Sequence, residues 1–168
     1  VIETLKELKG QSLDVDVVGV FSTQEEVGTR GAQVAAQTVK PDIAIVFEGS
    51  PADDTFTPDY LIQTALGRGP MLRHIDAKMI TNPRFIRYAI DLGEKLGIPV
   101  QQAVRTGGST NGAPIHLSGL GVPVIVIGLP VRYIHTHHCY ASLCDFENSV
   151  KLAVEIIKRL NADIIKNF

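Results

Sequence analysis

The 168-residue chain has no tryptophan, only two cysteines and no strong excess of either charge. Two cysteines, Cys139 and Cys144, are too few for a disulfide framework, which leads us to expect a reduced, cytoplasmic setting. The net charge of -2 provides no basic surface for nucleic acid or anionic lipid. No apolar run approaches the roughly 20 residues of a membrane span, and no signal-peptide pattern opens the chain. We therefore expect neither a nucleic-acid nor a membrane partner.

Apolar strand-like runs alternate with amphipathic, helix-like runs along the chain. Hydrophobic residues at 45% suffice for one domain, spanning residues 1–168. This alternation predicts an α/β fold, a three-layer α/β/α sandwich around a largely parallel, mixed sheet. We expect strands at residues 14–21, 42–48, 60–66, 98–104 and 122–129, and helices at 2–9, 32–39, 83–96 and, capped by Asp145, 146–164.

The first helix begins abruptly. Ile2, Leu5 and Leu8 have helical spacing and Gly10 is a natural stop, but no Ser, Thr, Asp or Asn precedes Val1 as a cap. This pattern favours a chain cut from a longer one, and the alternative is fraying of an ordinary helix end.

Two adjacent acids follow the apolar run at residues 17–21. Glu25 and Glu26 would point to opposite sides of an extended strand, and a turn at Gly28 and Gly31 would be needed to bring them to one site. Neighbouring carboxylates resist joint ionisation unless a cation lies between them. The repulsion would be relieved if one glutamate bound a metal ion and the other exchanged a proton with a bound water. The alternative is a solvated loop with two surface acids.

Two more polar side chains follow apolar runs. Glu48 ends the run 43–47, and His135 follows the run 122–131, where a neutral imidazole could bind a transition metal. In open α/β sheets ligands gather where strands end, so these residues and the Glu25–Glu26 pair are expected to converge.

Other sites are less well supported by the sequence. A zinc knuckle within residues 135–144 is disfavoured, because the spacing of its histidines and cysteines matches no usual template. The loop 106–114 contains Ser109 but lacks the frame of a serine nucleophile, so we expect it to line a pocket or a helix start.

The segments "STQEEVGTRGA", "IVFEGSPADDT", "GPMLRHIDAKMI" and "GLPVRYIHT" occur in this order. In combination they resemble the co-catalytic, dinuclear metallo-aminopeptidases, which include glutamyl aminopeptidase and the tetrahedral aminopeptidases; some relatives are labelled cellulase or endoglucanase. The resemblance covers essentially the whole chain.

The resemblance implies a role for each candidate residue. Glu25 would be the general base, Glu26 and His135 would bind one metal, and Glu48 would bind the other, at a position where the family more often has Asp. It also implies two divalent ions, zinc or cobalt, peptide substrates and a homo-oligomer in the complete protein.

The resemblance further implies a His ligand, a bridging Asp ligand and a small inserted domain. In the family all three precede the segment that corresponds to the start of this chain at Val1. Asp14 and Asp16 are poor substitutes for the bridge. The chain is therefore expected to be the C-terminal portion of the catalytic domain and inactive alone. The residues after Thr136 also depart from the family pattern.

Two other functions remain as alternatives. One is a non-catalytic binding or assembly module, which would hold no divalent ion between Glu26, Glu48 and His135. The other is a two-carboxylate glycosidase, which needs no metal. Aromatic residues at 6% and the lack of tryptophan leave few surfaces on which sugar rings could stack.

Overall fold

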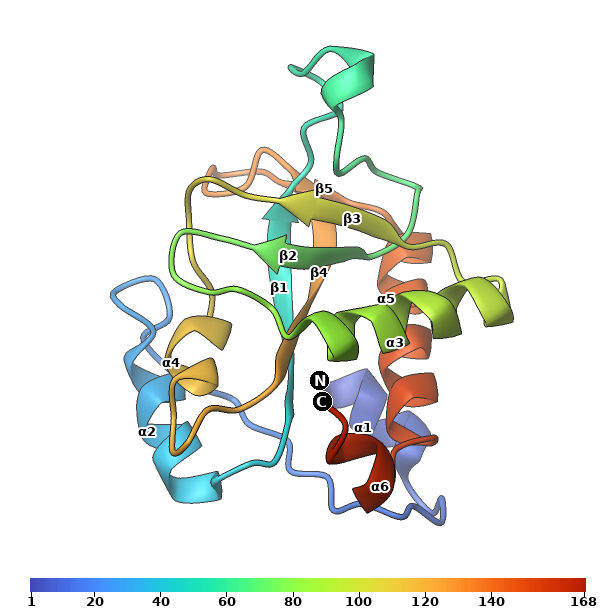
Figure 1. Cartoon of the computed structure of the whole chain (residues 1–168). Coiled ribbons are helices and arrows are strands. Elements are labelled where there is room, and N and C mark those ends of the chain that lie inside the picture. The colour runs from blue at the N-terminus through green and yellow to red at the C-terminus, as the bar shows by residue number, and fades with distance from the viewer.

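The computed structural model describes residues 1–168 and has helices on both sides of a central sheet (Figure 1). The strands are β1 (Ala44–Pro51), β2 (Met71–Ile75), β3 (Gln101–Val104), β4 (Val124–Arg132) and β5 (Tyr140–Ala141). The helices are α1 (Ile2–Leu8), α2 (Arg30–Val39), α3 (Pro83–Leu96), α4 (Gly112–His116), α5 (Leu143–Ile157) and α6 (Ala162–Ile165), with a 3-10 turn at Asp59–Leu61. None of these helices has the length and apolar character needed to cross a membrane.

The sheet order is β1-β4-β2-β3, with β5 pairing to β4. The pairs β1–β4 and β2–β3 are parallel, whereas β2 and β5 run antiparallel to β4. The predicted three-layer sandwich with a mixed sheet is therefore confirmed. Helices α3 and α5 cover one face, and α2 and α4 lie on the other (Figure 1).

Side chains alternate between the two faces of the sheet, because successive residues of a strand point in opposite directions. Ile125 and Ile127 of β4 pack in the larger core with α3 and α5. Val46 of β1 and Val126 of β4 pack in the smaller core beneath α4. Glu48 lies two residues beyond Val46, so it belongs to the face that α2 and α4 cover.

The expected strand at residues 14–21 is wrong. This segment bends at residues 14 and 15 and forms no strand, and none of its backbone N–H groups donates to a backbone carbonyl. Val18 and Phe21 are 61% and 65% exposed. Apolar composition alone does not make a strand when no neighbour completes the hydrogen-bond ladder.

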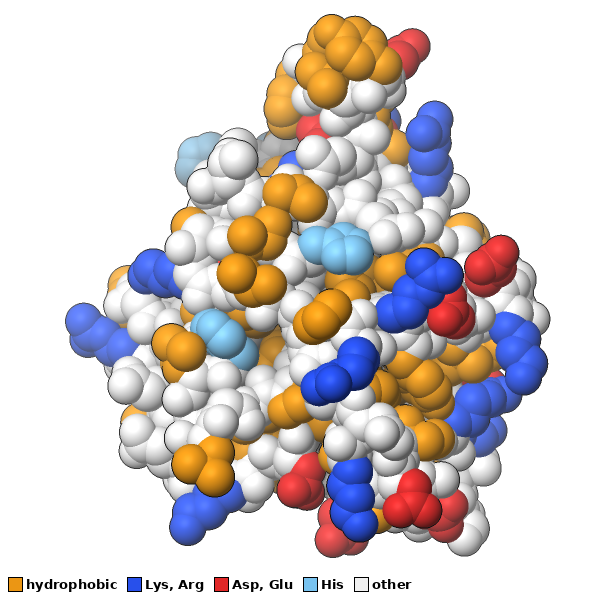
Figure 2. All heavy atoms as spheres, viewed as in Figure 1, with side chains coloured by type: hydrophobic (Ala, Val, Ile, Leu, Met, Phe, Trp, Pro, Cys, Tyr) orange, Lys and Arg blue, Asp and Glu red, His pale blue; other side chains and the backbone are white.

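The expected strand at residues 60–66 is also wrong. The segment that follows β1 projects from the molecule, with the 3-10 turn at its tip, and the strand comes later, as β2. Three large apolar side chains of this projection are exposed: Phe56, Tyr60 and Leu61. Figure 2 shows the hydrophobic surface that gathers at its tip.

Strand and helix ends shift elsewhere. Strand β1 continues to Pro51, so Glu48 lies inside the strand rather than at its end. Asn82 caps α3 and Gly97 ends it, as expected. The last helix is in fact two, α5 and α6, because the chain turns at residues 158–161.

Ser142 caps α5, in place of the expected Asp145. Asp145 lies one turn further on, fully buried, and its two carboxylate oxygens accept hydrogen bonds of 2.7 Å from the backbone N–H groups of Gly67 and Gly69. The carboxylate thereby fastens the chain just before β2 to the start of α5.

We expect Asp145→Ala to lower the free energy of unfolding by about 2–4 kcal/mol, because it leaves two buried N–H groups without acceptors. Urea denaturation followed by circular dichroism would measure the loss. Glu147→Ala, at an exposed position of the same helix, is the control and should cost under about 0.5 kcal/mol. Equal effects of the two substitutions would contradict the structural role of Asp145.

Candidate functional site

The two adjacent glutamates lie on a tight loop that leads into α2. We define the Glu25 loop as residues 22–29. It closes through hydrogen bonds from Thr29 N to Glu25 O (2.9 Å) and from Gly31 N to Thr23 O (3.0 Å). Gln24 and Thr29 both have left-handed backbone conformations. The predicted turn is therefore present.

Gly31 serves this loop by its lack of a side chain rather than by flexibility. Its own backbone is helical, but a Cβ there would lie 2.4 Å from Thr23 O and 2.5 Å from Thr23 N. Only glycine allows the start of α2 to approach so closely. Gly28 is the position of unusual backbone freedom, with φ of 112°.

His135 lies on the hairpin between β4 and β5. We define the His135 loop as residues 133–139. Thr136 Oγ1 donates to the carbonyls of Tyr133 (2.6 Å) and His138 (3.0 Å). Tyr133 and His135 have left-handed φ values of 59° and 63°. Such strain in non-glycine residues is concentrated at functional sites, and here it occurs in both loops of the candidate site.

The two loops meet at Glu26 and His135. Glu26 Oε1 lies 3.4 Å from His135 Nε2, although both side chains are largely exposed, at 75% and 70%. An exposed pair of this kind contributes little to stability. Two ligand atoms on one tetrahedral zinc, each about 2.1 Å from the ion, also lie about 3.4 Å apart. The oxygen and nitrogen donors therefore have the chemistry and spacing to hold one divalent cation.

Glu25 and Glu48 complete the acidic site. Burial, followed by the negative charge of Glu25, raises the pKa of Glu48 to about 7. Burial and the neighbouring Glu26 also raise the pKa of Glu25. Glu48 therefore lies within electrostatic reach of both loop glutamates. Such mutual repulsion is relieved by a bound cation.

A buried arginine faces the same acids and was missed by the sequence analysis. The charge of Arg73 on β2 lowers the pKa of both Glu25 and Glu48, against the effects of burial and repulsion. The sequence signal for this residue is a single arginine within the apolar run Met71–Ile75. It is two residues from the buried Met71 and therefore on the same face of the strand.

The described residues contain no group of three or more His, Cys, Asp or Glu side chains arranged to hold a metal ion. The structure thus joins Glu26 to His135, with Glu25 and Glu48 as electrostatic neighbours. Cys139 and Cys144 are free and exposed. The loop around Ser109 leads into α4, where Thr110 Oγ1 accepts from Gly112 N (3.1 Å), as the helix-start interpretation expects.

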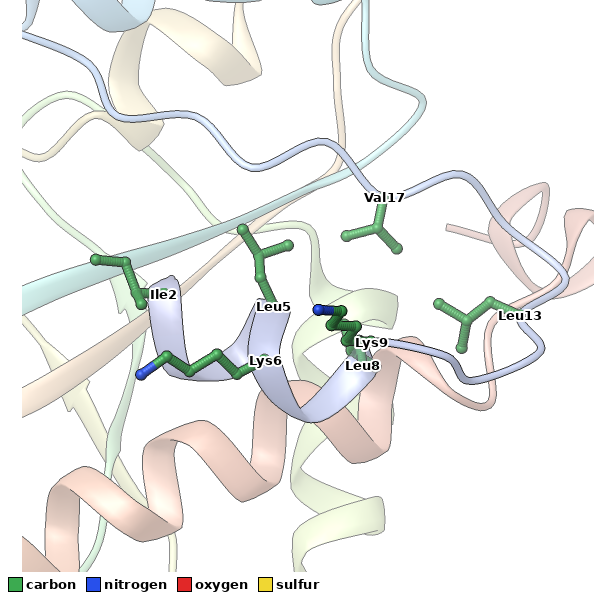
Figure 3. Close-up of a pocket in the computed structure, with 7 residues that line it drawn as sticks. All are labelled: Ile2, Leu5, Lys6, Leu8, Lys9, Leu13 and Val17. Atoms are coloured by element: carbon green, nitrogen blue, oxygen red, sulfur yellow. The ribbon is translucent and has the colours of Figure 1, made fainter.

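An apolar groove lies away from these acids, between α1 and the segment that follows it (Figure 3). Its volume is about 560 Å³, and its lining includes Leu5, Leu8, Leu13 and Val17. Its only charged side chains are Lys6 and Lys9, and none of the four candidate residues lines it.

Comparison with known proteins supports the resemblance found in the sequence. The family model described as M42 glutamyl aminopeptidase matches residues 1–152. A putative aminopeptidase of Acetivibrio thermocellus is 36% identical over 157 residues, which cover 94% of this chain and 47% of that protein.

Two solved structures share the fold. A TET aminopeptidase from a marine-sediment Thaumarchaeota archaeon superposes with a TM-score of 0.95 at 36% identity, covering 99% of this chain and 47% of that one. The TET1 peptidase of Pyrococcus horikoshii, described as assembling into a tetrahedron or a large octahedral shell, gives 0.83 at 29% identity, covering 95% and 46%. The chain thus spans about half the length of these relatives.

The raised pKa of Glu48 makes stability fall as pH rises. Below about pH 4.5 both folded and unfolded chains hold the proton; between 4.5 and 7 the unfolded chain loses it more readily. In metal-free protein, Glu48→Gln should therefore add about 1–2 kcal/mol of stability at about pH 8.5, after allowing for solvent screening of a half-buried group, and much less at about pH 5.

Urea unfolding at the two pH values would measure this difference. Glu94→Gln, at an exposed position of α3, is the matched control and should show no such gain. A gain from Glu48→Gln that is equal at both pH values would contradict the assignment.

Proposed function

Since this chain belongs to the M42 glutamyl aminopeptidase family, we propose that the complete protein is a metal-dependent aminopeptidase that removes N-terminal residues from peptides. The observation that supports this most directly is the 3.4 Å approach of Glu26 Oε1 to His135 Nε2, from two separate loops. Further support comes from Glu25, which precedes Glu26 in the chain, and from Glu48, whose pKa is raised by burial and by the charges of Glu25 and Glu26.

Each residue has a distinct part in the proposed reaction. Glu26 and His135 would hold one divalent cation, and Glu48, on β1, would hold a second. Zinc and cobalt suit this mixed oxygen and nitrogen donor set. Such cations, when bound, polarise the scissile carbonyl and make a bound water more acidic.

Glu25 is the proton carrier. Its carboxylate accepts a proton from the attacking water and delivers it to the amine nitrogen of the leaving peptide. Burial and the charge of Glu26 raise its pKa, and a higher pKa makes the carboxylate a stronger base.

We also propose that the complete protein is a homo-oligomer. This proposal rests on the P. horikoshii relative, which assembles into a tetrahedron or a large octahedral shell and superposes over 95% of this chain.

The ligand set implied by the resemblance includes a His and a bridging Asp that no residue of this chain matches.

In the full-length protein, Glu25→Gln should lower kcat by about 10²–10⁴-fold while leaving the metal content unchanged, because only the proton carrier is lost. Release of p-nitroaniline from aminoacyl p-nitroanilides and elemental analysis would measure the two quantities. Glu94→Gln should alter neither. Retention of the full rate by Glu25→Gln would exclude the proton-transfer role.

The 168-residue chain alone, supplied with Zn²⁺ or Co²⁺, should release no more p-nitroaniline than its Glu25→Gln variant. The reason is that Glu26 and His135 offer a cation only two ligand atoms, and this chain contains no group of three or more His, Cys, Asp or Glu side chains arranged to hold a metal ion. Steady turnover by the unaltered chain, lost in Glu25→Gln, would show that its own residues complete the site.

A further inference from the structure

Arg73 is a buried cation with partners on two sides. Its side chain is 5% exposed, and Nη1 donates to Asp76 Oδ2 at 3.2 Å. On the other side Nη2 donates to Ser50 Oγ at 3.2 Å. The third nitrogen, Nε, is buried and has no hydrogen-bond partner. A buried arginine with an unused donor is costly, so its retention calls for a role beyond packing.

The sheet is built to let this guanidinium reach β1. Arg73 is on β2 and Ser50 on β1, with β4 between them. At Gly128 of β4 a Cβ would lie 2.4 Å from Ser50 Oγ and 3.0 Å from Met71 Cε. Gly128 is also the register partner of Glu48. The absence of a side chain at Gly128 therefore leaves open the sheet face that Glu48, Ser50 and Arg73 share.

We propose that Arg73 is a positioning residue of the acidic site: its buried guanidinium, held between Asp76 and Ser50, secures the second half of β1, which bears Glu48, and supplies a fixed positive charge to the sheet face on which Glu48 lies. Neighbouring glutamates repel one another, and a partly buried charge such as that of Glu48 is poorly screened. A fixed positive charge on the same face of the sheet opposes this repulsion.

Asp76 explains how the guanidinium stays in place. Its other carboxylate oxygen, Oδ1, accepts hydrogen bonds of 2.9 Å from the backbone N–H groups of Lys78 and Met79. The anion is thus fixed by the turn after β2, and it fixes Arg73 in turn. The consequence for metal binding rests on the proposed function, but the interaction of Arg73 with the glutamates does not.

The test is a double-mutant cycle between Arg73→Met and Glu48→Gln in metal-free protein at about pH 8.5. Asp76 is kept in all four proteins because it holds Arg73 in place, and the cost of leaving Asp76 unpaired cancels in the cycle. Glu48→Gln should lower the equilibrium constant for unfolding in both backgrounds. The factor by which it does so should be at least about fivefold larger with Met at position 73 than with Arg73. Urea denaturation gives all four constants.

Arg73→Lys is the conservative variant and keeps the charge, so the effect of Glu48→Gln should stay within about twofold of that measured with Arg73. Glu94→Gln in place of Glu48→Gln should show no coupling to Arg73. Additive effects of Arg73→Met and Glu48→Gln, within about twofold, would overturn the proposal and leave Arg73 a packing residue. If Arg73→Met does not fold, the neutral variant Arg73→Gln takes its place in the cycle, and additive effects with Glu48→Gln would overturn the proposal equally. Neither readout needs activity, so failure of the aminopeptidase proposal would be seen separately.

Discussion

The parallel pairing of β1 with β4 is the constraint on which the candidate site depends. Eight consecutive residue pairs, from Ala44↔Val124 to Pro51↔Val131, fix the register of the two strands. Because parallel strands end at the same edge of a sheet, the loop after β4 is brought to the edge at which β1 ends, three residues beyond Glu48. A slip of one residue would turn Glu48 from the α4 side to the opposite face. The register of an apolar ladder thus decides whether polar groups far apart in the sequence can act together.

Much of this arrangement could be predicted from the sequence, because the governing patterns are local. The run that became β4 contains only apolar residues and one glycine over residues 122–129, and Asn82 with Pro83 marks the start of α3 in the usual way. The membership of the candidate site followed from polar residues placed after apolar runs. Glu26 and His135 do come together. The metal and catalytic roles of the four residues remain predictions.

The failures have a common physical origin, since each depends on partners that a single segment does not specify. Residues 14–21 have strand-like composition, but a strand also needs a neighbouring backbone, which this segment lacks. Asp145 resembles a helix cap in the sequence, but its carboxylate is bound by Gly67 and Gly69, far away along the chain. Arg73 went unnoticed because its partner Ser50 is on another strand. Tertiary contacts overrule local preference at all three positions.

The left-handed backbones of Gln24, Thr29, Tyr133 and His135 bear on the speed with which ions would enter and leave. Both loops are shaped by their own hydrogen bonds, so a cation arriving from solution meets Glu26 and His135 already facing each other. In the proposed metalloenzyme, uptake would then involve no slow ordering of these loops, and the exchange rate would be governed by how readily the ion sheds its hydration shell. Ions that hold water tightly, such as magnesium, would be disfavoured kinetically as well as by donor chemistry.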